Sequence, residues 1–68
     1  MSPDLCWTDV AEITFQLAEA HPDVDPKYVS FPELYRWVLA LPDFSDDPAR
    51  CNERVLEAIQ GAWLAELA

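Results

Sequence analysis

Apolar residues recur every three to four positions along three stretches of the chain, which is the spacing of one buried face of an α-helix. The first stretch covers residues 9–20, and its apolar face is Val10, Ile13, Leu17 and Ala20. Asp9 and Glu12 have the spacing of a capping box, although Thr8 is an equally good N-cap. Pro22 disfavours the helical conformation for the residue before it, so the sequence predicts that this helix ends there.

The second helical stretch has the clearest start signal in the sequence. Ser30, Pro32 and Glu33 provide an N-cap, a proline at the first helical position and the acid of a capping box. The core face that follows is Phe31, Leu34, Val38 and Leu41, flanked by Tyr35 and Trp37. Pro42 predicts the end of this helix. Residues 27–29, just before it, fit either an extended segment or a single helical turn, and that choice stays open.

The third stretch begins at Asp47 and Pro48, a cap followed by a proline, and runs to the C-terminus as the longest predicted helix. Its core face is Val55, Leu56, Ile59, Ala62, Trp63 and Leu67. Gly61 falls on the outer face, where a missing side chain opens no cavity. No segment alternates polar and apolar residues as a strand does. We therefore predict a compact all-α domain of three helices over residues 1–68, an arrangement that winged-helix and helix-turn-helix domains share.

The charge of the chain limits its partners. Thirteen acidic and four basic residues among 68 give a formal charge of −9. Such a field repels phosphates and attracts basic protein surfaces or metal cations. We expect no nucleic-acid partner, because duplex binding depends on clustered Lys and Arg. We also expect no membrane partner, because no apolar run approaches the roughly 20 residues of a membrane span. The sequence is typical of a monomeric cytoplasmic protein.

Residues for catalysis are scarce. The one histidine, His21, has no evident nucleophile partner and the chain is short for a stand-alone enzyme, so we expect no enzymatic activity. Cys6 and Cys51 lack CxxC spacing, and the chain has no ligand set for structural zinc. We interpret them as two free thiols, with a disulfide as the alternative. The three tryptophans are expected to anchor the core: Trp7, Trp37 and Trp63.

Eight of the thirteen acidic residues fall into two groups of four. One group is explained as helix caps or first-turn acids that complement the helix dipole: Asp9, Glu12, Glu33 and Asp47. Capping explains the others less well: Asp43, Asp46, Glu53 and Glu57. The loop from Asp43 is not an EF-hand, because Pro48 and Arg54 replace its glycine and glutamate. The second group forms either an ordinary solvated face or, beside the outward-facing Leu64 and Phe15, a docking patch.

Several fragments resemble a known family in their order and spacing. They are Trp7-Thr8-Asp9, Glu12-Ile13, Pro22-Asp23-Val24-Asp25-Pro26, Phe44, Asp46-Asp47-Pro48, Asn52-Glu53, Leu56-Glu57-Ala58-Ile59 and Trp63-Leu64. Together they cover nearly the whole chain and resemble the IscX family of small acidic proteins. The resemblance implies a three-helix domain related to winged helices that acts with the bacterial iron–sulphur cluster assembly machinery. It also implies binding to the cysteine desulfurase and, through an acidic surface, to iron.

The resemblance implies roles for the acids that match the family pattern: Asp9, Glu12, Asp23, Asp25, Asp46, Asp47, Glu53 and Glu57. As weak iron ligands on the surface we expect Asp9, Glu12, Asp23, Asp25, Glu53 and Glu57. As desulfurase contacts we expect Asp43, Asp46, Asp47, Glu53, Glu57 and Leu64. No tightly bound cofactor is expected. Ser45 and Tyr35 depart from the pattern, since an acid and a histidine are common at these positions.

Two functions fit this resemblance. The first is an acidic adaptor or regulator that docks on the cysteine desulfurase, with the cluster scaffold and ferredoxin as further candidate partners. The second is an iron donor that delivers iron to the scaffold. The sequence does not separate them, because both use the same carboxylates.

Overall fold

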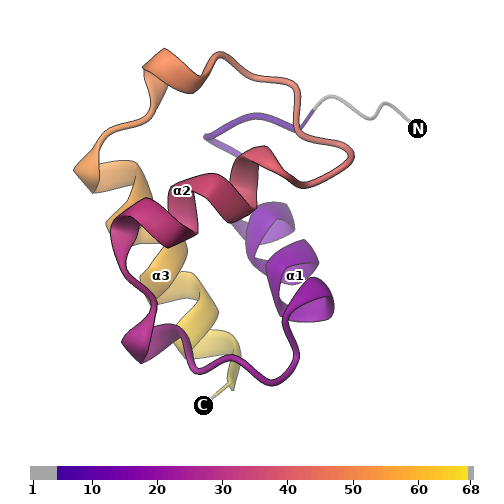
Figure 1. The fold of residues 1–68 in the computed structure, drawn as a ribbon, viewed down its shortest axis with the longest axis vertical. Helices are drawn as coiled ribbons and strands as arrows, with labels where there is room; N and C mark the ends of the chain where they lie inside the picture. Colours follow the sequence, from indigo (N-terminus) through magenta and orange to yellow (C-terminus); the bar gives the residue numbers. More distant parts are fainter. Residues whose placement is uncertain (1–4, 68) are drawn as a thin grey trace.

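The computed structural model describes residues 5–67 and contains three α-helices joined by loops with two short 3-10 turns (Figure 1). In chain order the elements are α1 (Val10–Ala20), η1 (Pro26–Tyr28), α2 (Phe31–Leu39), η2 (Pro48–Arg50) and α3 (Glu53–Leu67). α1 and α3 make the most extensive helix pair, and α2 packs against both. The only extended pairing in the described part of the chain is a bridge between Leu5 and Phe44. The predicted all-α, three-helix fold is confirmed.

α1 lies where the apolar pattern predicts, with a buried face that differs at two positions. Ile13 and Leu17 are fully buried as expected. Thr14 is buried as well, because it lies about 100° from Ile13 around the helix and the covered face is wide enough to include it. Ala20 is exposed, contrary to the prediction, where the chain turns away towards Pro22.

The start of α1 also differs from the prediction. Asp9 occupies the N-cap position, but its side chain makes no capping bond to the helix. Its Oδ2 instead accepts a hydrogen bond from the Cys6 backbone N–H over 2.9 Å, while the Asp9 N–H donates to the Cys6 carbonyl over 2.9 Å. Asp9 therefore closes the preceding turn, and the predicted Asp9 capping box is wrong. Glu12 accepts a hydrogen bond from Gln16 Nε2 over 3.1 Å.

α2 begins with the predicted capping box. Ser30 Oγ accepts a hydrogen bond from the Glu33 N–H, and Glu33 Oε1 accepts one from the Ser30 N–H. Pro32 occupies the second helical position, because Phe31 is the first. Of its predicted core face, Leu34 and Val38 are fully buried and Phe31 is partly buried. α2 ends at Leu39, before the predicted end at Pro42, so Leu41 is buried in the loop that follows the helix. The open choice at residues 27–29 resolves into the 3-10 turn η1.

The start of α3 was predicted wrongly. Pro48 opens only η2, in which Asp47 accepts a hydrogen bond from the Ala49 N–H over 2.9 Å. Cys51 then has an extended backbone, with φ −75° and ψ 144°, which separates this turn from the helix. Asn52 Oδ1 accepts a hydrogen bond from the Val55 N–H over 3.0 Å and so caps α3.

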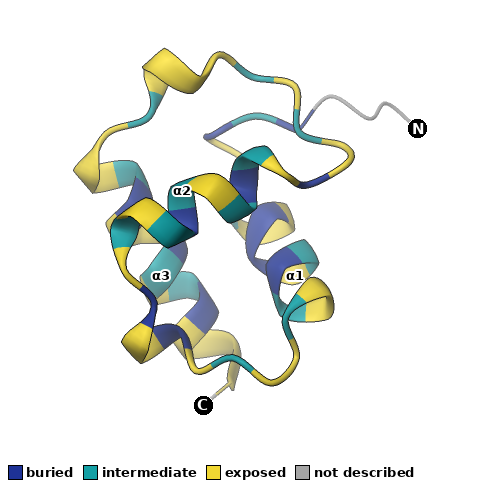
Figure 2. Cartoon of the chain, viewed as in Figure 1, coloured by how far each residue is buried: buried dark blue, intermediate teal, exposed yellow. Residues whose placement is uncertain are grey.

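The core lies where the three helices face one another (Figure 2). From α3 it receives Leu56, Ile59 and Trp63, as predicted, whereas Leu67 near the helix end is 58% exposed and was wrongly placed in the core. Gly61 is exposed and a Cβ there would contact nothing within 4 Å, in agreement with its expected outer position. None of the helices in residues 5–67 combines the length and apolar character needed to cross a bilayer.

Candidate protein-docking surface

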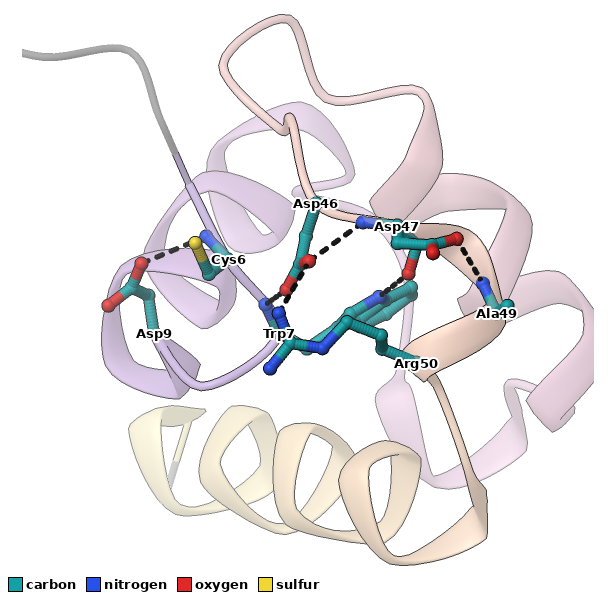
Figure 3. Close-up of polar contacts among 7 residues, drawn as sticks. All are labelled: Cys6, Trp7, Asp9, Asp46, Asp47, Ala49 and Arg50. Atoms are coloured by element: carbon teal, nitrogen blue, oxygen red, sulfur yellow. Dashed lines mark hydrogen bonds and ion pairs between the residues drawn. The ribbon is translucent and has the colours of Figure 1, made fainter.

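Asp46 lies at the junction between the N-terminal segment and the loop that leads to η2 (Figure 3). Its Oδ2 accepts a hydrogen bond from the Trp7 backbone N–H over 3.1 Å. Its Oδ1 accepts one from the Asp47 N–H over 2.7 Å and forms an ion pair with Arg50 Nη1 at 3.3 Å. The Asp46 side chain is only 7% exposed, so its carboxylate is engaged inside the molecule.

These donors change the acidity of Asp46. The hydrogen bond from the Trp7 backbone N–H, followed by that from the Asp47 N–H, holds the pKa of the carboxyl below its ordinary value of 3.8. Partial desolvation opposes this shift, and the Arg50 guanidinium adds to it. The carboxylate is therefore ionised at neutral pH, and its charge is directed at backbone donors.

Trp7 holds the same junction from the other side. Its indole Nε1 donates a hydrogen bond to the Asp47 carbonyl over 2.9 Å. Its ring meets Phe44 edge-on with centroids 4.7 Å apart, and stacks nearly parallel to Tyr35 at 5.9 Å. The expectation that Trp7 anchors the core is confirmed, since it is 2% exposed. Tyr35 is used in this aromatic contact.

The remaining predicted desulfurase contacts are accessible. Asp43 and Asp47 are exposed in the loop before η2, and Glu53, Glu57 and Leu64 are exposed on α3. At 100° per residue the last three lie within about 40° of one another, so they share one side of the helix. We call Glu53, Glu57 and Leu64 the α3 face. Within residues 5–67 no hydrogen bond or ion pair engages its two carboxylates.

The predicted iron ligands are spread over three parts of the fold. Asp9 and Glu12 lie at the start of α1, Asp23 and Asp25 in the loop after it, and Glu53 and Glu57 at the start of α3. Asp25 accepts a hydrogen bond from the Lys27 N–H over 3.0 Å and so caps η1. Nowhere in the described chain do three Asp, Glu, His or Cys side chains come together as a metal site would require.

Both cysteines are free thiols, as expected, in residues that are partly buried. Burial raises the pKa of the Cys51 thiol above its ordinary value of 9.0. The Cys51 Sγ lies 3.8 Å from the Asn52 carbonyl, to which it donates a weak hydrogen bond. This thiol is therefore less ionised at neutral pH than a free cysteine.

Sequence reasoning missed Gln16. Its Nε2 donates to Glu12 Oε2 over 3.1 Å and to Asp43 Oδ2 over 3.4 Å. The first contact has the one-turn spacing that a helix brings together, so the sequence contained a signal for it. The second joins residues 27 positions apart, and no local pattern indicates it.

Comparison with known proteins places these features in a family. The profile of the family described as "Iron-sulphur cluster assembly" matches residues 5–68, which is nearly the whole chain. An uncharacterised protein of Pseudomonas aeruginosa is 63% identical over 62 residues, covering 91% of this chain and 94% of that protein. These findings confirm the resemblance that the sequence fragments indicate. The chain therefore belongs to the IscX family of iron–sulphur cluster assembly proteins.

Proposed function

We propose that this protein acts in iron–sulphur cluster assembly as a non-catalytic adaptor that docks on the cysteine desulfurase through the α3 face and the exposed acids Asp43 and Asp47. The observation that carries the proposal is the α3 face itself, where two unengaged carboxylates lie on the same side of the helix as the exposed Leu64. Carboxylates that face solvent without a hydrogen bond or ion pair inside the molecule are available to a basic partner. The apolar Leu64 on the same side of the helix adds a contact whose strength does not depend on charge, so salt does not screen it.

Asp46 has a positioning role in this proposal. Because its carboxylate accepts two backbone hydrogen bonds, it holds the loop that presents Asp43 and Asp47. Removal of its charge would weaken docking by loosening that loop, without removal of a direct contact. This distinguishes Asp46 from Glu53 and Glu57, which would meet the partner directly.

Charge reversal on α3 tests the proposal. Glu53→Lys and Glu57→Lys are each compared with Glu66→Lys. This control makes the same charge change in the same helix, about 140° around the helix axis from Glu53 and about 180° from Glu57. Binding to purified cysteine desulfurase is measured by titration at low and high salt. We expect Glu53→Lys and Glu57→Lys to weaken binding at low salt about tenfold, with a smaller effect of Glu66→Lys. Equal losses in all three variants would show that only net charge matters and would overturn the docking face.

The apolar part of the α3 face has a separate test. Leu64→Ser removes an exposed apolar side chain of this face, and Tyr28→Ser is its control because Tyr28 is also exposed but lies in η1 and not on α3. Leu64→Ser should weaken desulfurase binding by a similar factor at low and high salt, since apolar contacts are not screened. A purely salt-dependent loss would contradict this contact.

Iron binding is the second candidate function, and the acids Asp9 and Glu12 favour it because they lie close in sequence at one end of α1. Ferrous iron accepts carboxylate oxygens. With no site of three ligands in residues 5–67, we propose that one or two carboxylates hold each ion and that water completes its shell. Anaerobic titration with Fe²⁺, followed by NMR, should broaden the Asp9 and Glu12 amide signals first. A response equal to that of Mg²⁺ under matched conditions would argue against an iron-donor role.

A further inference from the structure

The outward side of α1 borders a shallow groove. Five residues of the helix line it, with the spacing i, i+3, i+4, i+7 and i+8: Glu12, Phe15, Gln16, Glu19 and Ala20. The turn of Leu41, Pro42 and Asp43 completes its lining, and its volume is about 430 Å³. We call this the α1 groove. It contains no residue of the α3 face, and it shares only Asp43 with the docking surface proposed above.

The α1 groove has an apolar floor that remains in contact with water. Phe15 is 48% exposed, on the side of α1 opposite to the buried Leu17. Ala20, Leu41 and Pro42 extend the apolar surface around it. An aromatic side chain on the polar side of an amphipathic helix gives up favourable burial, which a partner would restore by covering it.

The rim of the α1 groove is acidic. Glu12, Glu19 and Asp43 line it, and no Lys, Arg or His is among the lining residues. Glu12 and Asp43 come from different elements, yet Gln16 Nε2 donates to both carboxylates, over 3.1 and 3.4 Å. Two carboxylates thus already converge on one nitrogen donor. A cationic nitrogen from another molecule would gain a stronger, charge-assisted pair of contacts at that place.

We propose that the α1 groove binds a short basic segment of a partner protein, with an apolar or aromatic side chain on Phe15 and Arg or Lys side chains against Glu12, Asp43 and Glu19. Charge complementarity selects this occupant. A nucleic acid would be repelled by the acidic rim, and a second copy of this chain would bring the same −9 charge. Arginine suits the convergent carboxylates best, because its planar guanidinium donates to two acceptors at once.

Two synthetic hexapeptides test the proposal. One has four arginines around a central Trp-Leu pair, and the other has Ser-Ser in place of that pair. Each is titrated into the ¹⁵N-labelled protein and followed by NMR. We expect the Trp-Leu peptide to bind about fivefold to tenfold more tightly than the Ser-Ser peptide, as one covered aromatic contact would give. The largest shifts should fall on Phe15, Gln16, Glu19 and Asp43.

Matched variants locate the contact. Phe15→Ser should remove the preference for the Trp-Leu peptide, whereas Tyr28→Ser, at an aromatic residue that is 78% exposed outside the groove, should keep it. Glu19→Gln should weaken both peptides more than Glu66→Gln does. Equal affinity for the two peptides, or shifts spread over all acidic residues, would overturn the proposal. Desulfurase binding does not enter this experiment, so its outcome is independent of the function proposed for the α3 face.

Discussion

The backbone N–H of Trp7 donates a hydrogen bond to Asp46 Oδ2 over 3.1 Å and joins two residues that lie 39 positions apart. The indole Nε1 of Trp7 also donates a hydrogen bond, to the Asp47 carbonyl over 2.9 Å. The N-terminal segment is thereby fixed to the loop before η2 by an acid that the sequence placed on the surface. Several measurable properties depend on this junction and on other polar groups of the fold.

The first prediction concerns the pH dependence of stability. Because its partners lower the pKa of Asp46 in the folded state, this carboxylate contributes stability that is fully present above the ordinary value of 3.8. That contribution is lost as pH falls through the lowered folded-state pKa. Asp46→Asn should therefore unfold at a lower temperature than the parent at pH 7. The two proteins should converge in strongly acidic solution, because a protonated Asp46 resembles asparagine. The unfolding temperatures of both proteins, measured between pH 2 and 7, test this prediction.

Arg50 provides the control for that experiment. Its side chain is 68% exposed, so its ion pair with Asp46 is screened by water. Arg50→Gln should keep most of the pH dependence, because the backbone donors at Trp7 and Asp47 remain. If Arg50→Gln changed the pH dependence of the unfolding temperature below pH 7 as much as Asp46→Asn does, the ion pair and not the backbone hydrogen bonds would stabilise the carboxylate.

The second prediction concerns Thr14, whose buried Oγ1 has no hydrogen-bond partner in the described structure. A buried hydroxyl without a partner costs about 1–3 kcal/mol of stability. Thr14→Val keeps the shape and removes the hydroxyl, so it should raise the free energy of unfolding by about 1 kcal/mol. Urea unfolding followed by tryptophan fluorescence measures the change. Thr8→Val at an exposed position is the control and should be near neutral, and destabilisation by Thr14→Val would show that the hydroxyl has a partner.

The third prediction concerns Gln60, which ties η1 to α3. Its Nε2 donates to the Pro26 carbonyl over 2.8 Å and to the Val29 carbonyl over 3.3 Å. Gln60→Met keeps the length of the side chain but leaves both carbonyls without this donor. We expect a loss of about 1–2 kcal/mol in the free energy of unfolding. Hydrogen exchange at the Val29 amide should also become faster, because that amide closes η1.

Gln16→Met is the matched control for Gln60→Met. Gln16 also donates twice, but its acceptors are exposed carboxylates that water can solvate in its absence. Its loss should therefore cost less than the loss of Gln60. Equal losses in the free energy of unfolding for the two substitutions would indicate that the hydrogen bonds of Gln60 are no better shielded from water than those of Gln16.

The fourth prediction concerns the reactivity of Cys51. Burial raises the pKa of its thiol, and only the thiolate is alkylated. In a Cys6→Ser background, iodoacetamide should modify the folded protein more slowly at pH 8 than the same protein unfolded in urea. The rate in the folded protein should keep rising as pH increases past 9. A folded-state rate equal to the unfolded one would contradict the burial of this thiol.

Local sequence signals were sufficient where the interactions that decide a feature lie within one or two helical turns. The spacing of Ile13 and Leu17 located α1, and Ser30 with Glu33 located the start of α2 through contacts three residues apart. The same reasoning failed at Pro48. A proline after an aspartate fits the start of any helical turn, and the pattern does not say whether the turn continues.

The candidate sites were predicted only in part. The acidic excess and the exposed positions of Glu53, Glu57 and Leu64 follow from composition and helical periodicity, and both agree with the structure. From the sequence alone, Asp46 was predicted to be a surface acid like Glu53 and Glu57. Its engagement depends on Trp7, and a contact between residues so far apart has no local sequence signature.

The sequence by itself determined that this chain is strongly acidic and folds into three helices, because helix periodicity and net charge are local or additive properties. Only the tertiary structure decided which carboxylates remain available to a partner. Asp46 is used inside the molecule, whereas Glu12 and Asp43 converge on Gln16 beside the exposed Phe15. That division depends on which segments meet once α1, α2 and α3 have packed, and packing brings together residues that the chain keeps apart.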